Sequence, residues 1–84
     1  MRASTLWDDV EHLVLSATRQ PATARQVAAR TGLTPDLAQA QLEVLQRDGF
    51  LAQSVDAGVR YQLTLTGRKR LSALTTRPGH PAAA

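Results

Sequence analysis

The sequence predicts an α+β domain that is mostly α-helical, with a short β-hairpin near its C-terminal end. Three observations predict this fold class. Apolar residues recur at helical spacing through most of the first fifty positions. A glycine turn at Thr31-Gly32 separates two short helical segments. After Gly49 the apolar residues alternate with polar ones, which is the pattern of a half-buried strand.

Length and composition narrow the class of protein. A chain of 84 residues makes one small domain. Because it has no cysteine, we expect neither a disulfide framework nor a thiolate metal site, and the reducing cytoplasm is the default location. No apolar run approaches the roughly 18 residues of a membrane span. Acids stand near the N-terminus where a secretion signal would be apolar. We therefore expect a cytoplasmic protein with no membrane partner.

The distribution of charge is more informative than the net charge of +3. Nine of the ten basic residues are arginine, and every acid lies at or before Asp56. The basic residues beyond that point are Arg60, Arg68, Lys69, Arg70 and Arg77. A basic C-terminal third favours a phosphate-rich or acidic partner, although clustered arginines are also ordinary solvated surface.

The first helix is expected to begin at a Thr5 cap, with Asp8 in the reciprocal position and Asp9 and Glu11 complementing the helix dipole. Its apolar face, at about 100° per residue, is Leu6, Trp7, Val10, Leu13, Val14 and Ala17. Trp7 lies at the edge of this face. A core role is favoured for it, and a dimer or partner surface is the alternative.

The next two helices are expected to form a helix-turn-helix pair. Thr23 caps the first, with Gln26 completing a capping box, and Gly32 ends it. Thr34 caps the second, and Pro35 takes its first helical position. The apolar side of this second helix is predicted to be Leu37, Ala38, Leu42, Val44 and Leu45. The opposite, exposed side is Asp36, Gln39, Ala40, Glu43, Gln46 and Arg47.

Two strands and a last helix complete the domain. The strands are expected over 50–55 and 59–65, joined by a short loop at 56–58. Thr66 is expected to cap a helix over 67–75. We assign residues 1–75 to a single domain and 76–84 to a disordered tail.

Three helices followed by a hairpin make a winged helix. Thr34-Pro35 opens the second helix of the pair, and Leu42-x-x-Leu45-x-x-x-Gly49-Phe50 closes it. Tyr61-Gln62-Leu63-Thr64-Leu65-Thr66-Gly67 follows the hairpin loop. These motifs resemble those of bacterial winged-helix transcription regulators of the MarR and ArsR type. The resemblance implies sequence-specific binding of double-stranded DNA by a small transcriptional regulator, nucleoid-associated when bound.

On this hypothesis the helix over 34–47 enters the major groove. Gln39 is the expected adenine reader, and Asp36 or Glu43 accepts a hydrogen bond from a cytosine amino group. Ala40 and Arg47 share the same exposed face.

The remaining expected contacts are to the DNA backbone. Thr34, with the free backbone N–H groups around Pro35, is expected to hold a phosphate. The preceding helix contributes the flanking residues Thr23, Arg25 and Arg30. The wing contributes Arg60, and the basic residues after the wing, Arg68, Lys69 and Arg70, add electrostatic attraction.

Alternatives from other classes stay open. The acids on the exposed helix face favour a protein-interaction adaptor in a larger assembly, and the basic wing side is compatible with non-specific nucleic-acid binding. A homodimer through the first helix and the C-terminal segment is plausible, because two-fold dimers read paired half-sites. We find no catalytic constellation, no metal-binding pattern, no cofactor motif and no evident small-molecule effector, so an enzyme is not expected.

Overall fold

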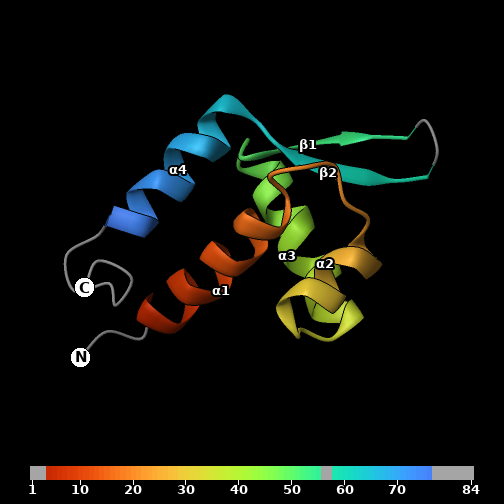
Figure 1. Ribbon diagram of the computed structural model, residues 1–84, viewed down its shortest axis with the longest axis horizontal. Coiled ribbons are helices and arrows are strands. Elements are labelled where there is room, and N and C mark those ends of the chain that lie inside the picture. The colour runs from red at the N-terminus through yellow and green to blue at the C-terminus, as the bar shows by residue number, and fades with distance from the viewer. Residues whose placement is uncertain (1–3, 56–57, 77–84) are drawn as a thin grey trace.

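The computed structural model describes residues 4–55 and 58–76 (Figure 1). The elements in chain order are α1 (Ser4–Ala17), α2 (Ala24–Thr31), α3 (Pro35–Arg47), β1 (Leu51–Ser54), β2 (Arg60–Leu63) and α4 (Leu65–Thr76). Four helices and a two-stranded antiparallel hairpin in the described ranges confirm a mostly helical α+β class. The layout is compatible with a winged helix. Of the tail expected over 76–84, Thr76 is instead the last residue of α4. The rest of that tail and the loop positions 56–57 lie outside the described residues.

The local signals around the helix pair are confirmed. Thr23 and Gln26 form both bonds of the capping box, at 3.1 and 2.9 Å. Gly32 ends α2 in the left-handed conformation at φ 79°, which glycine adopts without steric cost. The Thr34 hydroxyl accepts from the backbone N–H of Leu37 at 3.2 Å, and Pro35 opens α3.

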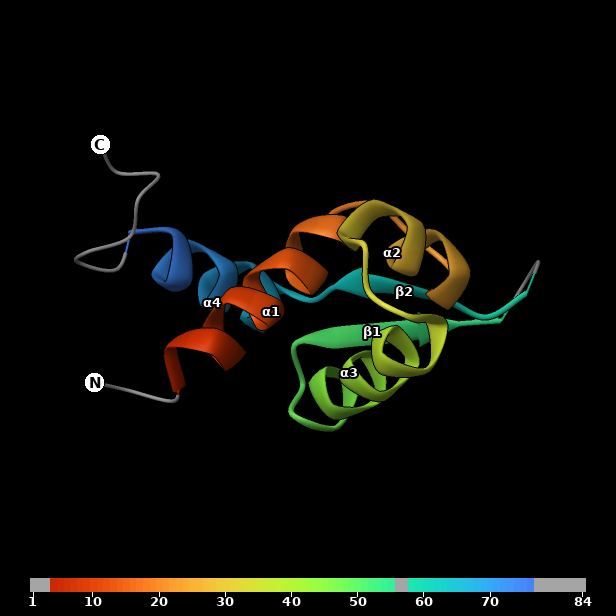
Figure 2. The same ribbon diagram turned by 90° about the horizontal axis from the view of Figure 1, so that it is seen from below.

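The hairpin is tied to the connector between α1 and α2. Leu51 pairs with Leu63 and Gln53 with Tyr61 in the antiparallel register. On the other side of β2, Tyr61 exchanges two backbone hydrogen bonds with Ala22, at 2.8 and 3.0 Å. Figure 2 shows the hairpin with α2 on one side and α3 on the other. Tyr61 is therefore fixed between two neighbouring segments.

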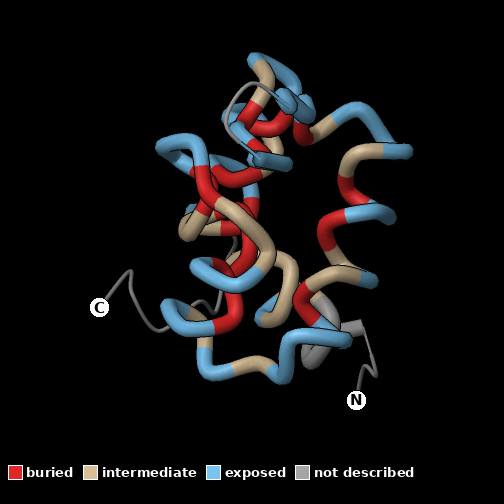
Figure 3. Tube along the Cα trace, turned by 90° about the vertical axis from the view of Figure 1, so that its right-hand side faces the viewer, coloured by how far each residue is buried: buried red, intermediate tan, exposed pale blue. Residues whose placement is uncertain are grey.

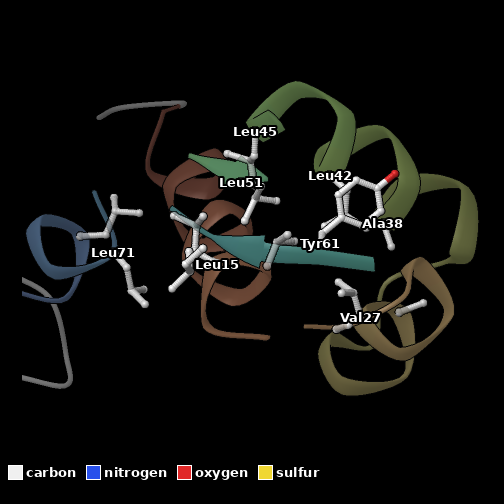
Figure 4. Close-up of a cluster of buried hydrophobic side chains, with 13 residues drawn as sticks. Leu15, Val27, Ala38, Leu42, Leu45, Leu51, Tyr61 and Leu71 are labelled. Carbon is white, nitrogen blue, oxygen red and sulfur yellow. The ribbon is translucent and has the colours of Figure 1, made fainter. Parts of the chain in front are cut away.

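The core gathers one or more side chains from every element. Red, buried positions line the inner side of each segment in Figure 3. The core members are Val14, Leu15, Ala22, Val27, Ala28, Ala38, Leu42, Leu45, Leu51, Tyr61, Leu63, Leu71 and Leu74, most of them drawn together in Figure 4. Tyr61 and Leu63 are buried while Arg60 and Gln62 are exposed, so the predicted alternation in β2 is confirmed.

The predicted details of α1 were partly wrong. Ser4 is already helical, so Thr5 lies inside α1 instead of capping it, and no acid lies in the first turn. Leu13 was expected in the core but is 44% exposed, whereas Leu15 is fully buried. Two residues along a helix are separated by about 200° around its axis, and α1 packs with the Val14–Leu15 side inward.

Two further boundaries differ from expectation. α4 begins at Leu65, because the Thr64 hydroxyl accepts from the backbone N–H of Gly67 at 2.9 Å and so serves as the cap assigned to Thr66. Leu65 is consequently an exposed helical residue and not part of a strand. On α3, Leu37 and Val44 were placed on the apolar side but are 37% and 41% exposed. The buried stripe of α3 is narrower than predicted and consists of Ala38, Leu42 and Leu45.

Candidate nucleic-acid interface

The elements expected to meet DNA lie toward one end of the molecule. In Figures 1 and 2, α2, the start of α3 and the far end of the hairpin lie toward the same side. The start of α1 and the end of α4 lie at the opposite end in both views. A surface formed by α2, α3 and the hairpin is thus separated from the start of α1 and the end of α4.

The outward face of α3 carries exposed apolar and acidic side chains. Asp36, Ala40, Glu43 and Arg47 are exposed, as predicted. Leu37 and Val44 are exposed beside them. Asp48 follows directly after the helix, so three carboxylates accompany one guanidinium here.

Gln39 is held by the protein itself. Its Nε2 donates to Glu43 Oε2 at 2.9 Å and to the hydroxyl of Tyr61 at 3.1 Å. Because a carboxylate only accepts, the group facing it must be the amide nitrogen and not the amide oxygen. Both amide hydrogens are therefore donated internally. The bidentate adenine contact expected of Gln39 needs one of them, so Gln39 would have to release Glu43 or Tyr61 to make that contact.

The start of α3 offers a phosphate two donors. The Thr34 hydroxyl accepts from Leu37 N and keeps its own hydrogen to donate, whereas Pro35 has no N–H. The second donor is the N–H of Asp36 in the first turn, next to that residue's own carboxylate. Thr23 likewise accepts in its capping box and keeps its hydroxyl hydrogen. The phosphate contact assigned to Thr34 stays a prediction.

Two predicted arginines remain available for backbone contacts. Arg25 on α2 and Arg60 at the start of β2 are both exposed, and within the described ranges neither forms a salt bridge. Arg30 is exposed as well, but its Nη1 donates to the carbonyl oxygen of Ala17 at 3.0 Å. Arg25 and Arg60 thus supply exposed cations to this surface from two separate elements.

Arg70 is engaged elsewhere. Its Nε donates to Glu11 Oε2 at 2.7 Å and its Nη2 to Glu11 Oε1 at 3.1 Å, and Asp8 lies 3.8 Å away. The hydrogen bond with Glu11 is the largest cause that raises the pKa of Arg70, opposed by partial burial. Asp8, expected in the reciprocal position of a Thr5 cap, and Glu11, expected to complement the dipole of α1, therefore join α1 to α4. Residues 59 positions apart cannot be paired from local spacing.

Arg68 and Lys69 are both exposed on α4. Arg68 borders an open pocket of about 520 Å³ together with Arg19 of the connector. The other lining residues are Gln20, Leu63, Leu71, Ser72, Thr75 and Thr76. Trp7 falls within α1, and its side chain lies outside the described part of the structure.

The described residues contain no group of three or more His, Cys, Asp or Glu side chains that could hold a metal ion. None of the described helices combines the length and the apolar character needed to cross a membrane. Comparison with models of known protein families gives no match, and neither does comparison with curated protein sequences.

Proposed function

We propose that this chain binds double-stranded DNA in a sequence-specific manner, as a small winged-helix transcriptional regulator acting in the cytoplasm at the nucleoid. The observation that carries the proposal is the capped α2–Gly32–α3 pair with its exposed α3 face, lying toward the same end as the hairpin. In helix-turn-helix proteins the second helix enters the major groove and the first crosses the backbone.

In this proposal phosphates are contacted mainly from outside α3. Arg25 precedes the turn and Arg60 lies on the hairpin, so the two cations flank the helix on separate elements. Their charge offsets the repulsion between phosphates and the carboxylates of α3. Lys69 and Arg68 on α4 add a longer-range attraction, screened beyond a Debye length of about 8 Å at physiological salt.

We further propose that the regulator works as a homodimer. The surface left for a second copy is the end where α1 begins and α4 finishes, opposite the α3 face. Such an arrangement would leave both copies of α3 free to reach paired half-sites.

A second candidate function is protein docking by the same α3 face. Leu37 and Val44 are both exposed and lie two turns apart along α3. Asp36 and Glu43 lie beside them. Apolar side chains rimmed by acids suit a basic, amphipathic partner segment better than they suit a phosphate backbone. Docking through these apolar side chains predicts an affinity for the protein partner that barely changes with salt.

The test is fluorescence anisotropy of a labelled random-sequence duplex at two salt concentrations, with sedimentation of the same samples. We expect affinity to fall with salt by about 0.9 log units per log unit of salt for each neutralised phosphate. An Arg25→Gln/Arg60→Gln double variant should lower that slope by about two units. Arg19→Gln, an exposed arginine on the connector, is the matched control and should keep most of the slope.

Absence of binding even at low salt would refute DNA binding. An equal effect of Arg19→Gln and the double variant would refute the assignment of Arg25 and Arg60. Sedimentation at the mass of one chain across the working concentrations would refute the homodimer.

A further inference from the structure

Glu43 is the one carboxylate on the exposed face of α3 that a second side chain holds in place, among the residues described. Its Oε2 accepts from Gln39, and Gln39 in turn bonds the hydroxyl of Tyr61. Tyr61 is 3% exposed, and its backbone is bonded to Ala22 on one side while it pairs with Gln53 on the other. Figure 4 shows the Tyr61 ring packed beside Leu42 and Ala38 of α3, with its oxygen directed toward α3.

These contacts run from a buried side chain to an exposed one. The rigid end is the buried tyrosine, the middle is the half-buried amide, and the exposed end is the carboxylate. Glu43 Oε1 makes no hydrogen bond with any described residue, so one acceptor oxygen is presented on the outward face of α3. A side chain pre-ordered in this way loses less rotamer entropy when it binds than a freely rotating glutamate does.

The chemistry of a lone, oriented acceptor selects one base in the major groove. Guanine presents two acceptors there and thymine presents the O4 acceptor, so both repel a carboxylate. Adenine offers its N6 amino group but places the N7 acceptor beside it. Cytosine offers the N4 amino group, and its own major-groove edge carries no acceptor. The exposed methyl of Ala40, one turn before Glu43, is compatible with that apolar pyrimidine edge.

We propose that Glu43 is a specificity-determining residue that selects cytosine at one position of the bound duplex. Gln39 and Tyr61 act as positioning residues that aim its carboxylate. The inference rests on the proposed DNA binding and deepens it, since it assigns the acidic helix face to base selection. Gln39 then contributes to specificity through Glu43 and not by reading adenine itself.

The experiment is selection of bound duplexes from a randomised library, followed by anisotropy on the selected duplex and its single-base variants. The proteins compared are the natural sequence, Glu43→Gln, Gln39→Ala and Asp48→Asn. Asp48→Asn is the matched control because it removes the same charge from an exposed residue directly after α3, to which no base contact is assigned. An amide at position 43 can both donate and accept, so Glu43→Gln should lose its discrimination.

We expect one position where the natural protein prefers cytosine by about fivefold or more over each other base. Glu43→Gln should flatten that position, and Gln39→Ala should weaken the preference while affinity for non-specific duplex is kept. Asp48→Asn should leave this position unchanged.

Binding of the library without any position that depends on Glu43 would overturn the inference and leave DNA binding standing. The same holds if Asp48→Asn flattens the position as much as Glu43→Gln does. Failure to bind any duplex at low salt would instead overturn the proposed function itself.

Discussion

Arg70 on α4 donates two parallel hydrogen bonds to Glu11 on α1, Nε to Oε2 at 2.7 Å and Nη2 to Oε1 at 3.1 Å. A bidentate pair of this kind has better geometry than most surface ion pairs. It joins the first helix to the last, and α2, α3 and the hairpin all lie between them in the chain.

Breaking this pair should lower stability modestly. We expect Glu11→Gln and Arg70→Gln each to reduce the free energy of unfolding by about 0.5–1 kcal/mol, the upper range for partly exposed pairs. Urea denaturation at low salt measures the loss, and the double variant should cost no more than the larger single one. Full additivity of the two losses would show that the side chains do not interact energetically.

The pH dependence of this contribution follows from the sign of the Arg70 pKa shift. The pKa of Arg70 is raised in the folded state, mainly by the Glu11 hydrogen bond. A raised pKa stabilises the fold fully at pH values below the ordinary arginine pKa and is lost only as pH rises through the raised one. The stability difference between the natural protein and Arg70→Gln should thus stay constant from about pH 7 to pH 10. A difference that shrinks across this window would contradict the assignment.

Gly67 allows α4 to lie directly against the turn between α3 and β1. A Cβ atom placed there would overlap the carbonyl oxygen of Phe50 and lie 2.9 Å from its carbonyl carbon. Backbone atoms cannot move aside as a flexible side chain can, so Gly67→Ala should cost about 1–3 kcal/mol through overpacking. Ser72→Ala, at an exposed position of the same helix, should stay within about 0.5 kcal/mol. Equal stability of the two variants by urea denaturation would contradict this close approach.

The packing side of α1 can be tested by a matched pair of leucines. Leu15 is fully buried and Leu13 is 44% exposed. Leu15→Ala should lower the free energy of unfolding by about 2–5 kcal/mol, because it leaves a cavity in the core. Leu13→Ala should cost less than about 1 kcal/mol, since much of that side chain already meets water. Comparable losses at the two positions would mean that α1 packs by another face.

Structural features that depend only on residues close together in the chain could be predicted from the sequence. The Thr23–Gln26 box, the left-handed Gly32 and the Thr34–Pro35 start depend on hydrogen bonds and dihedral preferences within four residues. Mistakes arose where tertiary packing decides. Periodicity defines an apolar arc but not its rotation, so Leu13 was placed inside.

The elements that form the candidate site could be predicted from the sequence, but the contacts between its side chains could not. The sequence identified α3 and its exposed polar residues, yet Gln39 bonds to Tyr61, 22 positions later in the chain. No helical or strand period relates two such positions. The pairing of Arg70 with Glu11 could not be predicted either, because no such period relates these two positions.

The link between Tyr61, Gln39 and Glu43 can be measured without any DNA. Tyr61→Phe removes only the hydroxyl and keeps the ring in the core, so one half-buried amide hydrogen of Gln39 loses its acceptor. We expect a loss of about 0.5–1.5 kcal/mol in the free energy of unfolding, the usual net value of such a bond. In the Gln39→Ala background the same substitution should cost much less, because the amide is already absent. The matched control is the same cycle with Gln46→Ala, whose amide bonds Gln53 instead. If Tyr61→Phe costs the same in all three backgrounds, the hydroxyl does not hold Gln39, and Glu43 would lack the anchored support that its proposed role requires.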